Sequence, residues 1–112
     1  MKYVCLVYSE EKKLDDVSDD ECLANSEILQ KKGHYLGGQA LQRIQTATTV
    51  RVRNGKVSIT DGPFAETKEQ LAGFYLIDAK DLDEAIQIAS KIPPARVGSI
   101  EVRPVRELQP SG

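Results

Sequence analysis

The clearest structural signal in the chain is the segment TTVRVRNGKVSIT, which occupies residues 48–60. An Asn-Gly pair at 54–55 separates two alternating runs, and both central residues of a tight hairpin turn need a positive φ that Asn and Gly tolerate best. A two-residue loop fixes the register, so that aliphatic side chains share one side and polar side chains the other, and we expect the aliphatic side to pack. The expected pairs are Val52–Val57 and Val50–Ile59 on the aliphatic side, and Thr49–Thr60 and Arg51–Ser58 on the polar side.

The segments around this hairpin predict further strands. Near-continuous apolar runs at residues 3–8 and 71–77 are typical of buried strands, and the first is expected to be a central strand buried on both faces. Residues 35–38 predict a short strand, and residues 99–104 alternate as a final strand that ends at a proline. The remaining connections, at residues 9–17 and 39–46, are expected to be loops.

Two helices are predicted from their end signals. Ser18 and Glu21 form a capping box, and Gly33 supplies the left-handed residue that ends the first helix. Asp81 caps the second helix, and Pro93-Pro94 stops it. The apolar stripe expected to face the core in the second helix consists of Leu82, Ala85, Ile86 and Ala89.

The resulting order indicates an α+β protein with a ferredoxin-like βαββαβ plan, an antiparallel sheet and the hairpin as an insertion. Residues 1–106 are expected to form a single domain, and residues 107–112 a C-terminal tail. Both helices would cover one face of the sheet and leave the other face bare. A second copy is the simplest cover for such a face, so we expect a homodimer packed sheet to sheet.

Composition narrows the function classes. The 112 residues are 40% hydrophobic and 29% charged, as in ordinary globular proteins, and the net charge of −2 disfavours direct nucleic-acid binding. The N-terminal apolar run is too short for a signal peptide or a membrane span, which predicts a cytoplasmic protein with no membrane partner. Cys5 and Cys22 are expected to be reduced, buried thiols. One histidine and two separated cysteines predict no metal site, and no cofactor is expected.

Residues 60–75, TDGPFAETKEQLAGFY, together with the hairpin before them, resemble the DGPF family, which is grouped with the YCII-related proteins. Residues 81–85 and 99–104 are similar to the second helix and last strand of that family. The resemblance implies a dimeric α/β barrel whose biochemical role is unassigned. It also implies a link to transcription initiation, because related domains are fused to, or encoded beside, sigma factors of the extracytoplasmic-function type.

YCII proteins proper carry a histidine in the first helix and an aspartate that together look catalytic. In this chain the expected first helix contains no histidine, and His34 follows Gly33 instead. The histidine half of that dyad is therefore not carried over by the motif. His34 has a side chain that titrates near neutral pH and is a candidate proton shuttle, or else an ordinary residue at a helix end.

Asp61 is the first catalytic candidate. At the end of a hairpin strand that opens toward a barrel cleft, it could act as a general base or accept a hydrogen bond from a ligand. Asp-Gly-Pro is also a good turn sequence, in which the carboxylate caps backbone donors. Candidate substrate-binding residues are Phe64 and Tyr75 as an aromatic wall with a hydroxyl, Glu66 and Lys68 in a polar loop, and Arg51 for an anionic group; packing or solvent exposure is the alternative for each.

The first functional interpretation is a homodimer that binds a small organic molecule in a cleft near Asp61, with proton-transfer chemistry that needs no cofactor. The alternative is a non-catalytic regulatory or interaction module, with a sigma factor as its partner.

Overall fold

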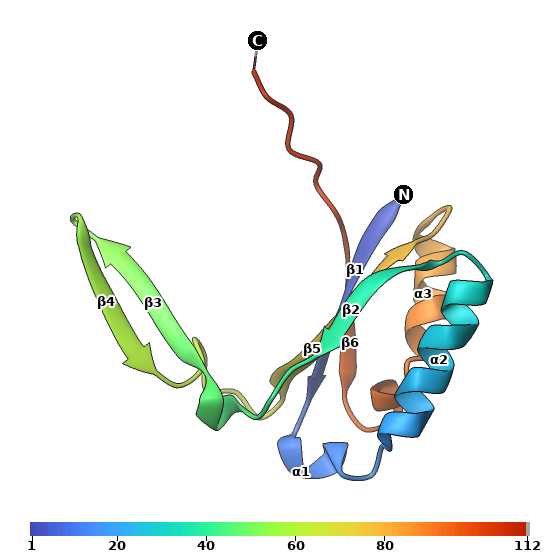
Figure 1. Ribbon diagram of the computed structural model, residues 1–112, viewed down its shortest axis with the longest axis horizontal. Helices are drawn as coiled ribbons and strands as arrows, with labels where there is room; N and C mark the ends of the chain where they lie inside the picture. Colours follow the sequence, from blue (N-terminus) through green and yellow to red (C-terminus); the bar gives the residue numbers. More distant parts are fainter. Residues whose placement is uncertain (112) are drawn as a thin grey trace.

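The chain forms one four-stranded antiparallel sheet and a separate two-stranded hairpin (Figure 1). A computed structural model describes residues 1–111. The four-stranded sheet has the order β2-β5-β1-β6, which is the ferredoxin-like arrangement with the hairpin β3–β4 inserted between β2 and β5. The fold predicted from the sequence is thereby confirmed. The strands are β1 (Lys2–Ser9), β2 (Tyr35–Ala40), β3 (Thr48–Arg53), β4 (Lys56–Asp61), β5 (Gln70–Asp78) and β6 (Ser99–Pro104).

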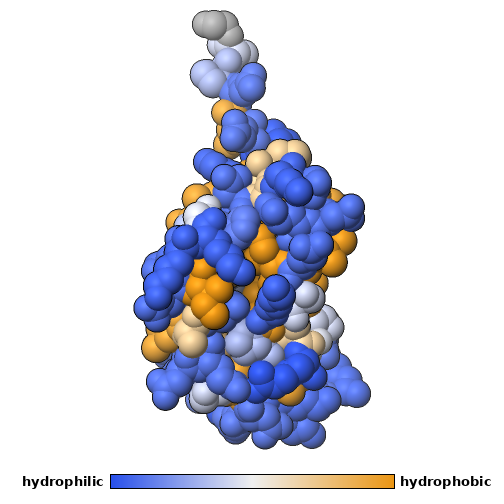
Figure 2. All heavy atoms as spheres, turned by 90° about the vertical axis from the view of Figure 1, so that its right-hand side faces the viewer, coloured by the Kyte–Doolittle hydropathy of each residue, from blue (hydrophilic) through white to orange (hydrophobic). Residues whose placement is uncertain are grey.

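Two helices, α2 (Asp19–Lys31) and α3 (Leu82–Ser90), cover one face of this sheet (Figure 1). Alternate side chains of β1 point toward them, because successive residues of a strand face opposite ways. Figure 2 views the molecule from the helix side and shows a largely polar surface with scattered hydrophobic patches. The buried core consists of Tyr3, Cys5, Val7, Leu29, Ile77, Ala79, Ala85, Ile88, Ala89 and Ile92.

Within residues 1–111, no helix covers the opposite face of the sheet (Figure 1). The side chains of β1 that point this way, Val4, Leu6 and Tyr8, are only partly buried, and so are Phe74 and Leu76 beside them on β5. We call these five residues the open sheet face. The expectation that the first strand is buried on both faces is therefore wrong within a single chain, where one face alone is buried.

The hairpin has the register that the sequence predicts. Val52 pairs with Val57 and Val50 with Ile59, while Asn54 and Gly55 have φ values of 52° and 74°. The expected packing of the aliphatic side is not found within the chain, because these four side chains are 57–68% exposed. The hairpin stands away from the four-stranded sheet (Figure 1).

The helix caps are also as predicted. The Glu21 amide donates to the Ser18 hydroxyl, the Ser18 amide donates to the Glu21 carboxylate, and the Glu84 amide donates to Asp81 Oδ1 over 2.9 Å. Three short helices occur that the sequence analysis assigned to connections: α1 (Glu11–Leu14), η1 (Ile44–Thr46) and η2 (Pro93–Arg96).

The stripe of α3 differs from the expected one. Ala85 and Ala89 are buried, but Leu82 and Ile86 are each 50% exposed, and Ile88 takes their place in the core. The core-facing side of this short helix is therefore narrower than the apolar pattern suggested. Within residues 1–111, no helix is long and apolar enough to cross a membrane.

Candidate functional site

Two adjoining clefts lie where α1 and the start of α2 meet the end of β2 and the start of β5. The first, here called the Tyr75 cleft, has a volume of about 560 Å³ and runs between α2 and the β2–β5 pair. The second, the Arg43 cleft, has a volume of about 480 Å³. Both volumes fall in the range of small-molecule sites. The residues common to both clefts are Leu14, Val17, Asp19, Leu41 and Ala72.

Aromatic rings and close-packed backbone shape the Tyr75 cleft. The rings of Tyr35 and Tyr75 meet edge to face, with centroids 6.3 Å apart. Gly38 and Gly73 also line the cleft. A Cβ atom at Gly38 would lie 2.7 Å from the Phe74 carbonyl oxygen, and one at Gly73 would lie 2.8 Å from that of Gln39. The two glycines thus let β2 and β5 come together without side chains at these positions.

The polar groups of the Tyr75 cleft come from α2 and β5. Cys22 and Ser26, one turn apart on α2, line it opposite Tyr75. Burial raises the pKa of the Tyr75 hydroxyl, while the neighbouring Ser26 and Asn25 side chains oppose that rise. Because the pKa of this phenol lies above its ordinary value, the hydroxyl is protonated at neutral pH and available as a hydrogen-bond donor.

Asn25 completes this polar group. Its Nδ2 atom is buried without a hydrogen-bond partner, which is uncommon for a side-chain donor in a folded protein. Asn25 lies next to the Tyr75 hydroxyl, so the unmet hydrogen bond of its Nδ2 atom costs free energy beside the cleft.

The Cys22 thiol in the same cleft is not activated. Burial raises its pKa, and the carboxylates of Asp19 and Glu21 raise it further, although Arg96 opposes them. A thiol needs a lowered pKa to serve as a nucleophile near neutral pH. Cys22 is therefore a polarisable part of the cleft wall rather than an attacking group.

We expect both thiols to react slowly with a disulfide reagent such as DTNB in the native protein. Burial raises the pKa of Cys5 from 9.0 to about 11, which lowers its thiolate fraction at pH 8 by about 100-fold. The rate for Cys22 should rise about tenfold for each pH unit above pH 8, because its pKa is raised by burial, whereas Cys5 should react only on unfolding. A Cys22→Ser variant isolates Cys5 in this measurement. Rapid labelling of both thiols in the native protein at pH 8 would contradict the expectation.

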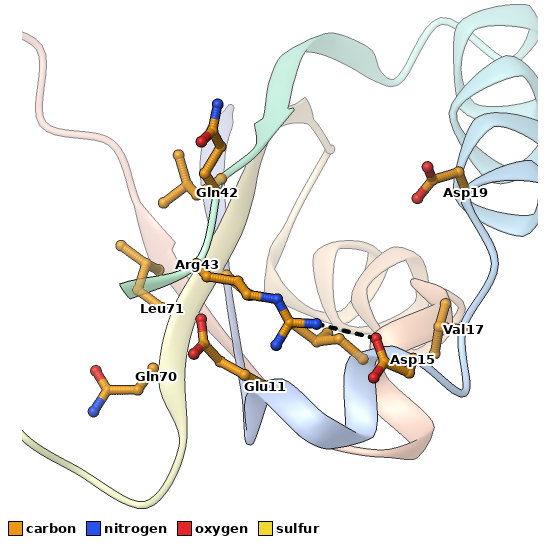
Figure 3. Close-up of a pocket in the computed structure, with 11 residues that line it drawn as sticks. Glu11, Asp15, Val17, Asp19, Gln42, Arg43, Gln70 and Leu71 are labelled. Carbon is orange, nitrogen blue, oxygen red and sulfur yellow. Dashed lines mark hydrogen bonds and ion pairs between the residues drawn. The ribbon is translucent and has the colours of Figure 1, made fainter. Parts of the chain in front are cut away.

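The Arg43 guanidinium and the Asp15 carboxylate form an ion pair in the Arg43 cleft (Figure 3). Arg43 Nη2 lies 3.3 Å from Asp15 Oδ1, and Glu11 Oε2 accepts a 2.8 Å hydrogen bond from the Ile44 amide. These contacts tie the segment after β2 to α1. We assign them a structural role, and the Tyr75 cleft is the stronger candidate for a ligand.

Asp61 lies elsewhere. It is the last residue of β4, it is exposed, and it is not among the residues that line either cleft. The turn that follows it is well defined: Gly62 has a φ of 107°, its amide donates to the Ala47 carbonyl over 2.8 Å, and its carbonyl accepts from Thr49 Oγ1 over 2.9 Å. The segment thus has a clear structural role at the base of the hairpin.

His34 lies near the opposite end of the sheet from Asp61. Its Nδ1 atom is 2.8 Å from the Asp78 carbonyl oxygen, so this nitrogen carries the proton, and Glu84 Oε1 is 3.9 Å away. Within one chain, the two residues that we considered as catalytic are not neighbours. They remain separate predictions.

The other four predicted binding residues lie outside both clefts: Arg51 is on β3, and Phe64, Glu66 and Lys68 are in the segment between β4 and β5. The Arg51 guanidinium lies 5.5 Å from the centre of the Phe64 ring, which is 77% exposed. Glu66 is exposed, and Lys68 Nζ lies 3.6 Å from Glu10 Oε1. Of the predicted site residues, Tyr75 alone lines the Tyr75 cleft.

The sequence analysis missed Cys22, Ser26 and Tyr35, which line this cleft, and Asn25 beside Tyr75. A signal was present in part, because Cys22, Asn25 and Ser26 place three small polar or thiol side chains at helical spacing on one face of α2. Nothing in the sequence indicated that this face lies opposite Tyr75.

Comparisons with known proteins agree with the fold. A family model described as the YCII-related domain matches residues 1–109. An uncharacterized protein of Rhizobium meliloti (strain 1021) is 39% identical over 119 residues, which cover 98% of this chain and 96% of that protein. A similar solved structure is 5-chloro-2-hydroxyhydroquinone dehydrochlorinase (TftG) from Burkholderia phenoliruptrix AC1100 in complex with 2,5-dihydroxybenzoquinone. It has a TM-score of 0.54 and 14% identity, and covers 95% of this chain and 94% of that one.

Proposed function

From the premise that the chain belongs to the YCII-related family, we propose that it binds a small organic molecule in the Tyr75 cleft. The observation that carries the proposal is a cleft of about 560 Å³ whose aromatic wall includes a protonated phenol. The ligand of the similar dehydrochlorinase structure, a dihydroxylated quinone, has the chemistry that such a wall would hold: a flat ring that carries oxygen acceptors.

In this proposal Tyr75 donates a hydrogen bond to an oxygen of the ligand. A donor held at the edge of an apolar cleft polarises a carbonyl or stabilises a phenolate, and no cofactor is needed for either. The Ser26 and Asn25 side chains lie beside this hydroxyl. The proposed chemistry is thus proton transfer to, or polarisation of, a ring oxygen of the ligand, and Tyr75 is the donor.

The proposed active form is a homodimer that packs through the open sheet face. This apolar surface is not covered by any helix of the described chain, residues 1–111, and consists of Val4, Leu6, Tyr8, Phe74 and Leu76. Surfaces of this kind on small domains commonly serve as interfaces. The alternative, a regulatory module that binds a sigma factor, stays a prediction, and no contact in the chain supports it.

The test compares the affinity of the protein and of a Tyr75→Phe variant for 2,5-dihydroxybenzoquinone, measured by calorimetry. Loss of one hydrogen bond to a ligand oxygen should weaken binding by about tenfold. Tyr3→Phe is the matched control, because Tyr3 lies in the core, does not line the cleft and has its hydroxyl against the Met1 sulfur, and this variant should bind like the unchanged protein.

Asp61→Asn is measured beside these variants. If it abolishes binding while Tyr75→Phe does not, the site lies at the base of the hairpin, as the sequence analysis expected, and the Tyr75 cleft is rejected. Equal affinities for all variants would show that neither residue contacts this ligand.

A further inference from the structure

Asn25 of α2 carries a buried donor that the proposed binding site does not use. Its Nδ2 atom is buried and has no hydrogen-bond partner among residues 1–111. A buried donor without a partner lowers stability, and folded proteins keep few such groups. An unmet donor that is kept beside a candidate site therefore calls for a use at that site.

The group within reach of this amide is the Tyr75 hydroxyl. The Asn25 and Ser26 side chains both lie close enough to the Tyr75 oxygen to oppose the rise in its pKa that burial causes. Ser26 lines the Tyr75 cleft, whereas Asn25 is not among the residues that line either cleft. Asn25 is therefore placed to act on a ligand through Tyr75 and not by direct contact.

We propose that Asn25 is a positioning residue, whose Nδ2 atom donates a hydrogen bond to the Tyr75 oxygen when Tyr75 gives its proton to the ligand. The oxygen of a neutral phenol is a modest acceptor, but hydrogen bonds to an anionic oxygen are shorter and roughly twice as strong. The donor is thus unmet while Tyr75 is neutral and becomes paired as charge develops. An interaction that forms only with the developing charge favours the proton transfer itself.

The step is a single proton transfer that determines the class of ligand. The O–H bond of Tyr75 breaks, an O–H bond forms on the ligand, and the electron pair stays on the Tyr75 oxygen, to which Asn25 and Ser26 donate. The reverse transfer restores the phenol. Such a transfer needs a ligand oxygen about as basic as a phenolate, so the ligand is a ring compound that passes through an enolate or phenolate. This inference rests on the proposed function and adds to it a second residue and a class of ligand oxygen.

The surroundings of Tyr75 leave this task to α2. Of the side chains that influence its pKa, only Ser26 and Asn25 favour the phenolate. Asp19 is the one charged residue among those that line the cleft, and its carboxylate disfavours a second anion there. The titratable groups around Tyr75 that supply no stabilising donor are Asp19 and Cys22 from α2, Tyr35 from β2 and Cys5 from β1.

Titration of Tyr75 in the free protein tests this role. A tyrosine fluorinated beside its hydroxyl, placed at position 75, gives a single fluorine NMR signal and titrates in a milder pH range than tyrosine. In Asn25→Leu the phenolate loses a donor, so the pKa should rise, and the acid dissociation constant of this phenol should fall by about tenfold. Gln30→Leu is the matched control, because it removes an amide from an exposed position of the same helix and should leave the titration unchanged.

Thermal unfolding separates this role from a structural one. Asn25→Leu replaces an unmet buried donor by an apolar group, so its unfolding midpoint should equal or exceed that of the unchanged protein. A structural Asn25 would give a lower midpoint with an unchanged titration. Asn25→Asp is the second variant, should the leucine variant not fold: it keeps the shape of the side chain, and its carboxylate should also raise the pKa of Tyr75.

The remaining outcomes are decisive for the inference and separate it from the proposed function. An unchanged titration in Asn25→Leu overturns it. So does a lower pKa, which would mean that the Asn25 carbonyl accepts a hydrogen bond from the neutral phenol. The titrations contain no ligand, so either result leaves binding in the Tyr75 cleft to be judged by the calorimetry of Tyr75→Phe alone.

Discussion

Replacement of Gly98 by alanine is expected to lower the free energy of unfolding by about 3 kcal/mol or more. Gly98 leads from η2 into β6 and packs against the end of β1. A Cβ atom at this position would lie 2.1 Å from the Tyr8 carbonyl oxygen and 3.0 Å from Ser9 Cβ. Neither contact can be relieved by a side-chain rotation, because the first involves backbone and Ser9 is fully buried. The strand β1 or β6 must shift instead.

Urea unfolding measures this loss, and Gly37→Ala is the matched control. Gly37 also lies in the sheet, but a Cβ atom there meets nothing within 4 Å and its φ is not positive. Its free energy of unfolding should change by less than about 1 kcal/mol. If both variants lose the same stability, the loss comes from the general effect of removing a glycine and not from the approach of β1.

Ile77→Ala is the second large change, with an expected loss of about 2–5 kcal/mol. Ile77 is fully buried near the C-terminal end of β5, opposite Tyr3 on one neighbouring strand and Tyr35 on the other. Truncation leaves a cavity between the sheet and the helices, and the surrounding strands are held by ladder hydrogen bonds that limit collapse.

Ile86→Ala controls for the chemistry of this substitution. It removes the same atoms from α3, where the side chain is 50% exposed, and alanine is also a better helix former. We expect its free energy of unfolding to change by less than about 1 kcal/mol. Thermal and urea unfolding should rank the two variants in the same order, and a reversed order would contradict the core assignment.

The parts of the fold that local chemistry controls were predictable from the sequence. The hairpin register follows from an Asn-Gly turn whose two residues need positive φ, and the structure has φ values of 52° and 74° there. The caps at Ser18 and Asp81 depend on side chains within three residues of each other, so they too could be predicted without knowledge of the fold.

The candidate site could not be predicted in the same way. Ser26, Tyr35 and Tyr75 come from α2, β2 and β5, and only the packing of α2 on the β2–β5 edge brings them together. The burial of the hairpin side chains was also not predictable from the sequence. The aliphatic pattern that includes Val50 and Ile59 shows which side of the hairpin is apolar, but it does not show what covers that side.

The turn at Gly62 gives the most recognisable segment of the sequence a geometric meaning. Its amide bonds to the Ala47 carbonyl and its carbonyl to the Thr49 hydroxyl, and these two contacts join the start of the β3–β4 hairpin to its end. With a φ of 107°, Gly62 sets the angle at which the chain leaves the hairpin toward β5. In this chain, Asp-Gly-Pro-Phe thus fixes the direction in which the β3–β4 hairpin projects.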